Sequence, residues 1–343
     1  MADTVLVTGI TGFIGSNTAV KLLKKGYKVR GTARNPEKAE KVSVKICEAA
    51  GVPDGSIDII AAELTSDEGW TEAVKDCRYI QHIASPLPIE PPMNREGLVP
   101  EARAGALRVL EAGFEAGAER IVMTSSIASM IGQKNRPRKF TFGEQDWSNP
   151  DWKKQTAYPV SKTRAELSAW EFAESQNGKD RLTTINPGLV FGPDSFNNGS
   201  ASLEVVKALM IKQFPASPKL ALPIIDVRDV ASIHVAAMTA PKAAGRRLIA
   251  AGETLWFKEV AAVLKDAYPE LKTSRGEMPN FALKFFSLFD ERVKTLLADL
   301  GVYHIADTAY VGNITQVIPR SAKEAILATA ASLIESGSVR ARA

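Results

Sequence analysis

The sequence predicts an α/β protein built on a doubly wound parallel sheet, with helices covering both faces. Three observations indicate this class. Short β-branched runs alternate with longer segments of helical periodicity, several of the runs are apolar throughout, and the first helical segment ends at a glycine. Strands that are apolar on both faces and separated by helices pair in parallel, since a crossover helix must carry the chain back between them.

The first half of the chain supplies five strands and two long helices. The first strand, TVLVTG at 4–9, stops at a glycine, and the helix that follows it, SNTAVKLLKKG at 16–26, ends at Gly26, as helices commonly do. The remaining elements of this half are predicted at 28–34 (KVRGTAR, strand), 57–64 (IDIIAAEL, strand), 79–85 (YIQHIAS, strand), 101–117 (EARAGALRVLEAGFEAG, helix) and 120–126 (RIVMTSS, strand).

The second half is regular only in part. It supplies a helix at 161–178, a strand at 181–188 and another strand at 246–252, whereas the rest is richer in proline and phenylalanine. We therefore expect two units and a frayed tail. The large unit consists of residues 1–190 and, later in the chain, residues 224–250. The smaller lobe consists of residues 191–223 and 251–335, and the tail of residues 336–343.

Composition and charge exclude several classes of function. The chain has 343 residues, with 43 basic and 39 acidic side chains, and a net charge of +4 is too small to indicate nucleic acid or an acidic membrane. Cys47 and Cys77 lie far apart, without histidines or cysteines at metal-ligand spacing, so we expect no metal site. The N-terminus resembles no signal peptide, and the expected location is the cytoplasm.

A glycine triplet follows the first strand. Gly9, Gly12 and Gly15 stand in VTGITGFIGS, between a strand and a helix. Glycines there allow a sharp turn and let the backbone N–H groups at the start of the helix approach an anion. This context predicts a site for the pyrophosphate of a dinucleotide in the large unit. The alternative is a tight turn that binds nothing.

The end of the second strand indicates which dinucleotide is bound. NAD sites have an acidic residue there that binds the ribose 2′-hydroxyl, but this chain reads GTARNPEK and offers Arg34 and Lys38 instead. Two cations would attract a 2′-phosphate that an acid would repel. We therefore predict NADP(H), against the alternative that these residues form an ordinary polar loop.

A second constellation predicts carbonyl chemistry. Ser125 and Ser126 end the predicted fifth strand, and Tyr158 precedes Lys162 by one helical turn. A hydride reaction at a carbonyl needs a group that holds the oxygen, a proton donor and a group that tunes the donor. Ser126, with Ser125 as the alternative, would hold the oxygen and Tyr158 would donate the proton. Lys162 would lower the pKa of Tyr158 and bind the nicotinamide ribose.

These residues, in this order, resemble the extended branch of the short-chain dehydrogenase/reductase superfamily, whose nucleotide-binding unit is a Rossmann fold. The likeness is greatest to dihydroflavonol reductases, cinnamoyl-CoA reductases and the microbial aldehyde and ketone reductases. It extends over nearly the whole chain. The segments that carry it are VTGITGFIGS, GTARNPEK, HIASP, LVPEARAGALRVLEAG, IVMTSS, YPVSK, INPGLVFGP and DVRDVA.

The resemblance implies a catalytic triad of Ser126, Tyr158 and Lys162, and it adds further contacts. Those to the cofactor would come from Thr11, Phe13 and Ile14 at the pyrophosphate, Glu63 and Leu64 at the adenine, and Ala84, Ser85, Pro187, Gly188 and Val190 at the nicotinamide. The substrate would contact Leu87, Ile131 and Phe196.

The expected activity is NADPH-dependent reduction of an aldehyde or ketone to the alcohol, by a monomer or homodimer. Two alternatives are a 3β-hydroxysteroid dehydrogenase or sugar epimerase of the same fold, and a regulatory protein that senses NADP without catalysis. The chain departs from the related pattern at residues 105–108, where relatives have a threonine and an asparagine and this chain has neither. An aromatic stripe at 280–293 is expected to cover the substrate pocket or to pack into the smaller lobe.

Overall fold

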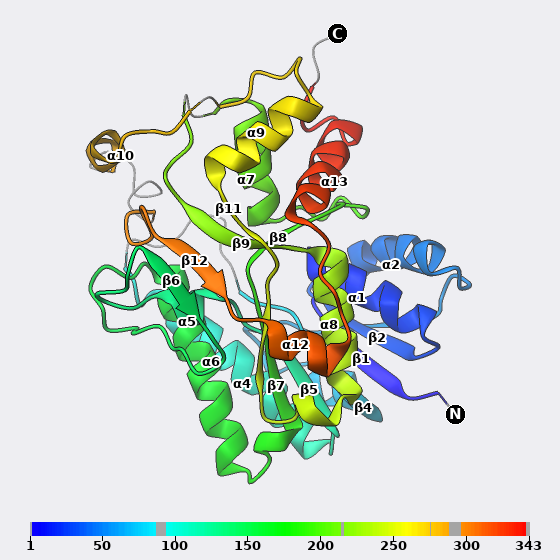
Figure 1. Cartoon of the computed structure of the whole chain (residues 1–343). Coiled ribbons are helices and arrows are strands. Elements are labelled where there is room, and N and C mark those ends of the chain that lie inside the picture. The colour runs from blue at the N-terminus through cyan, green and yellow to red at the C-terminus, as the bar shows by residue number, and fades with distance from the viewer. Residues whose placement is uncertain (1, 87–93, 214–215, 275, 288–295, 341–343) are drawn as a thin grey trace.

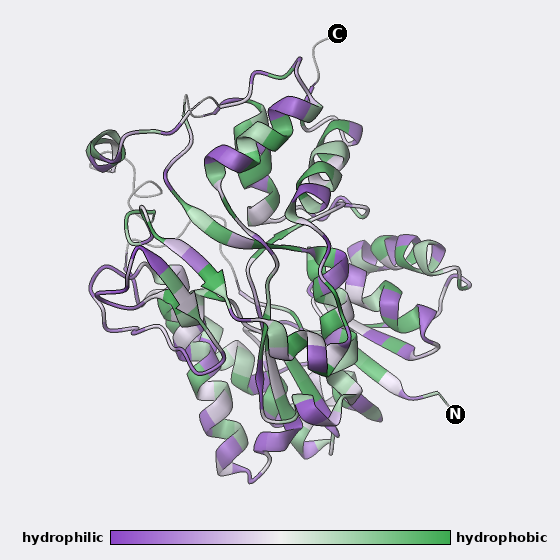
Figure 2. Cartoon of the chain, in the orientation of Figure 1, coloured by the Kyte–Doolittle hydropathy of each residue, from purple (hydrophilic) through white to green (hydrophobic). Residues whose placement is uncertain are grey.

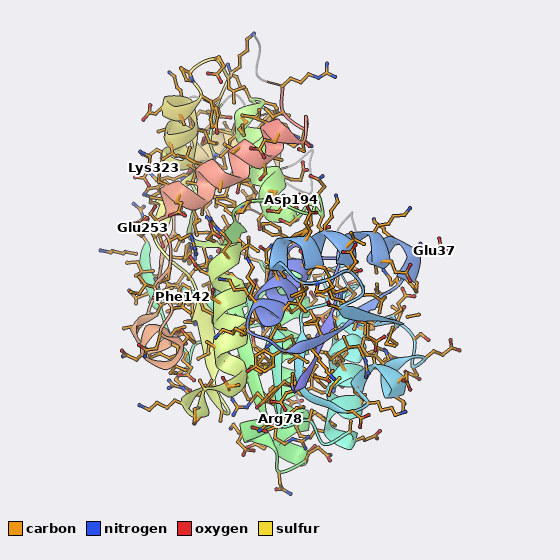
Figure 3. The ribbon with its side chains drawn as sticks, turned by 90° about the vertical axis from the view of Figure 1, so that its right-hand side faces the viewer. Glu37, Arg78, Phe142, Asp194, Glu253 and Lys323 are labelled. Atoms are coloured by element: carbon orange, nitrogen blue, oxygen red, sulfur yellow. The ribbon has the colours of Figure 1, made fainter. Side chains whose placement is uncertain are left out.

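The structure, a computed structural model, describes residues 2–86, 94–213, 216–274, 276–287 and 296–340. A parallel sheet with its helices forms one part of the molecule, and a smaller group of helices lies beyond one edge of that sheet (Figure 1). Figure 3 shows the same division from the side, with Lys323 and Asp194 in the smaller part and Arg78 at the opposite end of the larger one. None of the described helices is both long and apolar enough to cross a lipid bilayer.

The central sheet confirms the predicted fold class. Its seven strands are all parallel, in the order β3-β2-β1-β4-β5-β7-β10. The strand order reverses between β1 and β4, which is where doubly wound sheets bind ligands. The strands are β1 (Thr4–Thr8), β2 (Lys28–Ala33), β3 (Ile57–Ala61), β4 (Cys77–His82), β5 (Arg120–Thr124), β7 (Leu182–Pro187) and β10 (Arg247–Ala250).

Helices cover both faces of this sheet, as its apolar strands require. One face packs against α1 (Phe13–Lys24), α2 (Pro36–Ala50), α8 (Val227–Thr239) and α12 (Ala309–Thr315). The other face packs against α3 (Trp70–Val74), α4 (Val99–Glu115) and α6 (Ala157–Ser175), while the short α5 (Ala128–Ile131) follows β5. Figure 2 shows hydrophobic residues along the central strands and hydrophilic ones on the outer helix surfaces.

Local sequence sets the ends of α2. The side chain of Asn35 accepts a hydrogen bond from the backbone N–H of Lys38, and Pro36 occupies the first turn, where its missing N–H costs nothing. Gly51 ends the helix with a φ of 74°, a conformation that favours glycine. These signals place the start of α2 directly after β2, so that Arg34 lies in the turn between the two elements.

A second, mixed sheet supports the smaller lobe. It runs in the order β11-β9-β12-β6, and β8 pairs with β9 outside that order. The strands are β6 (Lys139–Phe142), β8 (Leu189–Phe191), β9 (Ala221–Asp226), β11 (Thr254–Trp256) and β12 (Tyr303–Ala306). Helices α7 (Ala201–Met210), α9 (Phe257–Ala267) and α13 (Ala322–Glu335) pack around a separate apolar cluster that includes Phe191, Leu264 and Ile326.

The structure differs from the predicted boundaries in three places. β6 lies inside the range assigned to the large unit, yet it pairs with β12 in the second sheet. The chain returns to the large sheet through α8 and β10, because β9 pairs in the second sheet up to residue 226. Val339, in the predicted tail, is buried, and its N–H donates to the carbonyl of Leu333; residues 341–343 lie outside the described ones.

The aromatic stripe at 280–293 forms a helix, α10 (Asn280–Phe286), over its described part. Leu283 packs into a small cluster with Met278, as predicted for a helix of the lobe, but Phe281 and Phe285 are 76% and 59% exposed. Helix α10 lies at the periphery of the molecule (Figure 1), so only one side of it meets a core. The predicted packing into the smaller lobe is therefore observed for Leu283, while these two rings are exposed.

Candidate active site at the carboxyl edge of the sheet

The glycine triplet forms a closed turn between β1 and α1. Gly9 has a φ of 65°, and its carbonyl accepts a 2.9 Å hydrogen bond from the N–H of Gly12, which caps the helix. A Cβ on Gly15 would lie 2.2 Å from the Gly9 carbonyl oxygen, and one on Gly9 would lie 3.0 Å from the Cα of Ala84. The first turn of α1, all of which the structure describes, holds no acidic residue, so the turn is suited to an anion.

The turn is fixed to the neighbouring strand at the point where the strand order reverses. The Thr8 hydroxyl accepts hydrogen bonds of 3.0 Å from the N–H groups of Ile83 and Ala84, and it lies 3.0 Å from Nδ1 of His82. Burial lowers the pKa of His82 to about 3. His82 is therefore a neutral, hydrogen-bonded side chain that holds β1 and β4 together, as its position in a buried strand predicts.

Arg34 and Lys38 lie where the sequence predicts them, in the turn after β2 and in the first turn of α2. Both side chains are exposed, and neither forms an ion pair with any residue that the structure describes. β2 pairs with β1 up to Thr32 opposite Thr8, so Arg34 lies beside the glycine turn. Two cations are thus available next to the anion site.

The other predicted cofactor residues follow the ends of other strands of the same sheet. Phe13 is buried in the core, which leaves only its backbone for a ligand, while Thr11 and Ile14 are half-buried. Glu63 is exposed and Leu64 packs against Gly105 after β3. The remaining ones are Ala84 and Ser85 after β4, and Pro187 and Gly188 at the end of β7; Val190 lies in β8, which pairs with β9 in the second sheet.

Tyr158 and Lys162 both lie in the first two turns of α6, which begins four residues earlier than predicted. The Ser126 side chain lies close enough to the Tyr158 hydroxyl to lower the pKa of that phenol. The Lys162 ammonium lies 6.0 Å from the centre of the Tyr158 ring and donates a 3.0 Å hydrogen bond to Oγ of Ser85. The structure thus brings together residues of α6 and of the segments that follow β4 and β5, which the sequence assigns to one reaction.

Burial shifts the pKa values of both Tyr158 and Lys162. It raises the pKa of Tyr158, and the Ser126 side chain opposes this effect. Burial also lowers the pKa of Lys162 to about 8, against the opposing effect of the Glu166 carboxylate. The reason is that both groups are removed from water, which disfavours each charged form.

Ser125 and Ser126 have different surroundings. The hydroxyl of Ser125 donates a 2.6 Å hydrogen bond to Glu166, whereas the oxygen of Ser126 accepts from the N–H of Ala128 and lies near the Tyr158 hydroxyl. The geometry therefore favours Ser126 over the alternative. The sequence assigned no role to Glu166, nor to its partners Asn186 and Arg247, because they come together only in the folded chain.

Two of the three predicted substrate residues are described, and they lie in different apolar clusters. Ile131 is buried in a cluster with Phe140 and Phe142, and Phe196 is buried in the main core with Leu203. Leu87 lies outside the described residues. A cavity does lie beside Lys162, between the ends of β4 and β5 and helices α4 and α6, and its lining includes Ser85, Ala102, Ala106 and Glu166.

The chain is similar to proteins of known family. Residues 5–251 match the model of the NAD dependent epimerase/dehydratase family. Cinnamoyl-CoA reductase 1 of Arabidopsis thaliana is 35% identical over 298 residues, which cover 85% of this chain and 83% of the relative. The NADPH-dependent methylglyoxal reductase GRE2 of Saccharomyces cerevisiae is 33% identical over 296 residues, covering 80% and 84%.

A solved structure agrees with these matches over the entire fold. The yeast methylglyoxal/isovaleraldehyde reductase Gre2, crystallised with NADPH, superposes with a TM-score of 0.77 at 27% identity, covering 98% of this chain and 99% of that one. The chain belongs to the NAD dependent epimerase/dehydratase family, that is, to the extended short-chain dehydrogenases/reductases, and it is an oxidoreductase of that family.

Proposed function

We propose that the protein reduces the carbonyl group of an aldehyde or ketone to the alcohol with NADPH, in the manner of the dihydroflavonol and cinnamoyl-CoA reductases. The observation that supports this most directly is the meeting of Ser126, Tyr158 and Lys162 at the carboxyl edge of the sheet. The relatives named as reductases support the same reaction class.

The residues present fit NADP(H). The turn from Gly9 to Gly15 leaves no room for a Cβ where the backbone must approach the pyrophosphate. Arg34 and Lys38 are exposed cations at the end of β2, the position from which a 2′-phosphate would be bound. A guanidinium pairs with phosphate through two parallel hydrogen bonds, so Arg34 is the stronger candidate of the two.

Each catalytic side chain has one role. The bound cofactor supplies the hydride. Ser126 donates a hydrogen bond to the carbonyl oxygen and orients it, and Tyr158 transfers its phenolic proton to that oxygen as negative charge develops. Lys162 supplies a positive charge beside Tyr158, which favours the phenolate that remains after proton transfer.

The test measures NADPH oxidation by absorbance over a panel of aldehydes, diketones and flavanonols, with NADH in parallel. We expect turnover with NADPH, and we expect Tyr158→Phe to bind NADPH normally while losing about 10²–10⁴-fold in kcat. Tyr27→Phe, a half-buried tyrosine remote from the site, is the matched control. Full activity in Tyr158→Phe, or no turnover of any carbonyl by the unchanged protein, would refute the proposal.

A further inference from the structure

A buried ion pair adjoins the candidate active site, since one of its members, Glu166, is on the same helix as Tyr158 and Lys162. The side chains of Glu166 on α6 and Arg247 on β10 are 0% and 6% exposed, with 2.7 Å between Oε1 and Nε. The guanidinium also lies 3.6 Å from the centre of the Trp147 ring. Buried ion pairs are weak sources of stability, because the cost of removing two charges from water offsets their attraction. Stability alone therefore does not account for a charge at this position.

The Glu166 carboxylate holds the segment that carries Ser126. It accepts hydrogen bonds of 2.6 Å from Ser125 and 2.5 Å from Ser129, on either side of that residue. It accepts a further bond of 2.9 Å from the amide of Asn186. The amide of Asn186 also donates to the backbone carbonyl of Ser126 at 3.3 Å, and the Ser129 oxygen lies 2.7 Å from that carbonyl, so its one proton is shared between the carbonyl and Glu166. One carboxylate thus fixes the backbone on both sides of the hydroxyl that meets Tyr158.

The same carboxylate also acts on Lys162. Glu166 lies one helical turn beyond Lys162 on α6, and both side chains line the same cavity. Its negative charge favours the protonated form of Lys162, which burial disfavours. The other titratable or charged groups that face this pair come from three elements: Tyr158 on α6, the neutral His82 on β4, and Arg247 on β10, which pairs with Glu166.

We propose that Glu166 is a positioning residue of the active site, which keeps Lys162 protonated and holds Ser126 in register with Tyr158. This role rests on the proposed function, because positioning Lys162 and Ser126 matters only if these residues act in carbonyl reduction. The role also predicts a measurable effect of the Glu166 carboxylate, on the titration of Lys162. If Glu166 acts only as packing, then its removal changes stability but leaves the titration of Lys162 where it is.

The central variant is Glu166→Gln, which keeps the shape of the side chain and removes its charge. We expect the pH above which kcat/KM falls to move toward acid by about one unit, since an opposite charge at this range is lost. We also expect kcat to fall more than tenfold with little change in the KM for NADPH. Glu174→Gln removes an exposed carboxylate from the far end of the same helix and should shift neither quantity.

Two further variants separate the effect of losing the Glu166 charge from any effect on folding. Glu166→Asp keeps the charge and should restore the pH profile of the unchanged protein at least in part. Glu166→Gln leaves Arg247 buried without its partner, so the double variant Glu166→Gln/Arg247→Met removes both charges and protects folding. The double variant also lacks the carboxylate that favours the charged form of Lys162, so it should show an acid shift as well.

A direct titration distinguishes failure of this proposal from failure of the proposed function. The ¹³Cε signal of Lys162 is followed against pH in labelled protein without substrate, with a Lys162→Arg sample for assignment. We expect its midpoint to be lower in Glu166→Gln than in the unchanged protein. An identical midpoint in both would overturn the positioning role even if the enzyme is active, whereas a shifted midpoint in a protein that reduces no carbonyl would overturn only the reaction.

Discussion

The Lys162 ammonium donates a 3.0 Å hydrogen bond to Oγ of Ser85, and this bond ties the second turn of α6 to the chain just beyond β4. The two residues are 77 positions apart in the sequence. A buried ammonium needs a partner for its protons, since an unpaired one is strongly disfavoured. Ser85 therefore fixes where the positive charge lies relative to Tyr158 and to the predicted nicotinamide side of the cofactor.

Replacing Ser85 by alanine should weaken catalysis without unfolding the protein. The variant removes one hydrogen bond to a charged group, a contribution of about 1.5–3 kcal/mol, so kcat/KM should fall by about tenfold or more. Steady-state kinetics with a substrate found in the panel measures this. Ser175→Ala, at an exposed position near the end of α6, is the control. Equal kinetics for the two variants would show that the Ser85 bond is unimportant.

Cofactor choice should depend on the two exposed cations after β2. In the double variant Arg34→Ala/Lys38→Ala we expect the KM for NADPH to rise by about tenfold or more, while the KM for NADH changes little, because only NADPH has the 2′-phosphate. Lys41→Ala/Lys45→Ala removes the same charge from the exposed side of α2 and should leave both constants unchanged. An equal loss with both cofactors would contradict a phosphate-specific contact.

Gly15 should tolerate no side chain. A Cβ there would lie 2.2 Å from the carbonyl oxygen of Gly9, which is backbone and cannot swing aside. Gly15→Ala should thus open the turn, abolish measurable NADPH binding by fluorescence titration and lower the free energy of unfolding by about 1–3 kcal/mol. Gly143→Ala is the matched control, because a Cβ at Gly143 would meet nothing within 4 Å. Normal binding by Gly15→Ala would exclude the turn as the pyrophosphate site.

The features that could be predicted from the sequence are those encoded locally. The glycine turn and the pair Tyr158 and Lys162 each depend on spacing within about ten residues, and Arg34 is found from its place at the end of the second strand. The alternation of apolar strands with helices determines the parallel sheet. The strand order places these local motifs at one edge of the sheet. Local sequence motifs therefore predict most residues of the candidate site.

What the sequence did not reveal depends on contacts between distant segments. Glu166 is an unremarkable acid in a helix until Arg247, 81 residues away, is placed against it. The second sheet likewise pairs β6 with β12 across about half the chain, and short strands of this kind carry a weak pattern. For Phe281 the sequence predicted a contact that the described part of the structure does not have. Helical periodicity indicates an apolar face but not whether another element covers it.

The pH dependence of the reaction should follow Lys162 and not a histidine. Burial lowers the pKa of Lys162 to about 8 and the pKa values of His82 and His234 to about 3. Lys162 therefore loses its charge as the pH rises through about 8, so kcat/KM for carbonyl reduction should be level from pH 5.5 to 7 and fall above 8.

Initial rates from pH 5.5 to 10 with saturating NADPH measure this profile. Lys162→Arg provides the decisive comparison, since a guanidinium stays charged throughout this range. The variant should be slower at neutral pH, because the longer planar group does not fit the ammonium site beside Ser85, yet its rate should not fall above pH 8. A fall at the same pH in both proteins would assign the alkaline limb to another group, such as Tyr158, whose pKa burial raises.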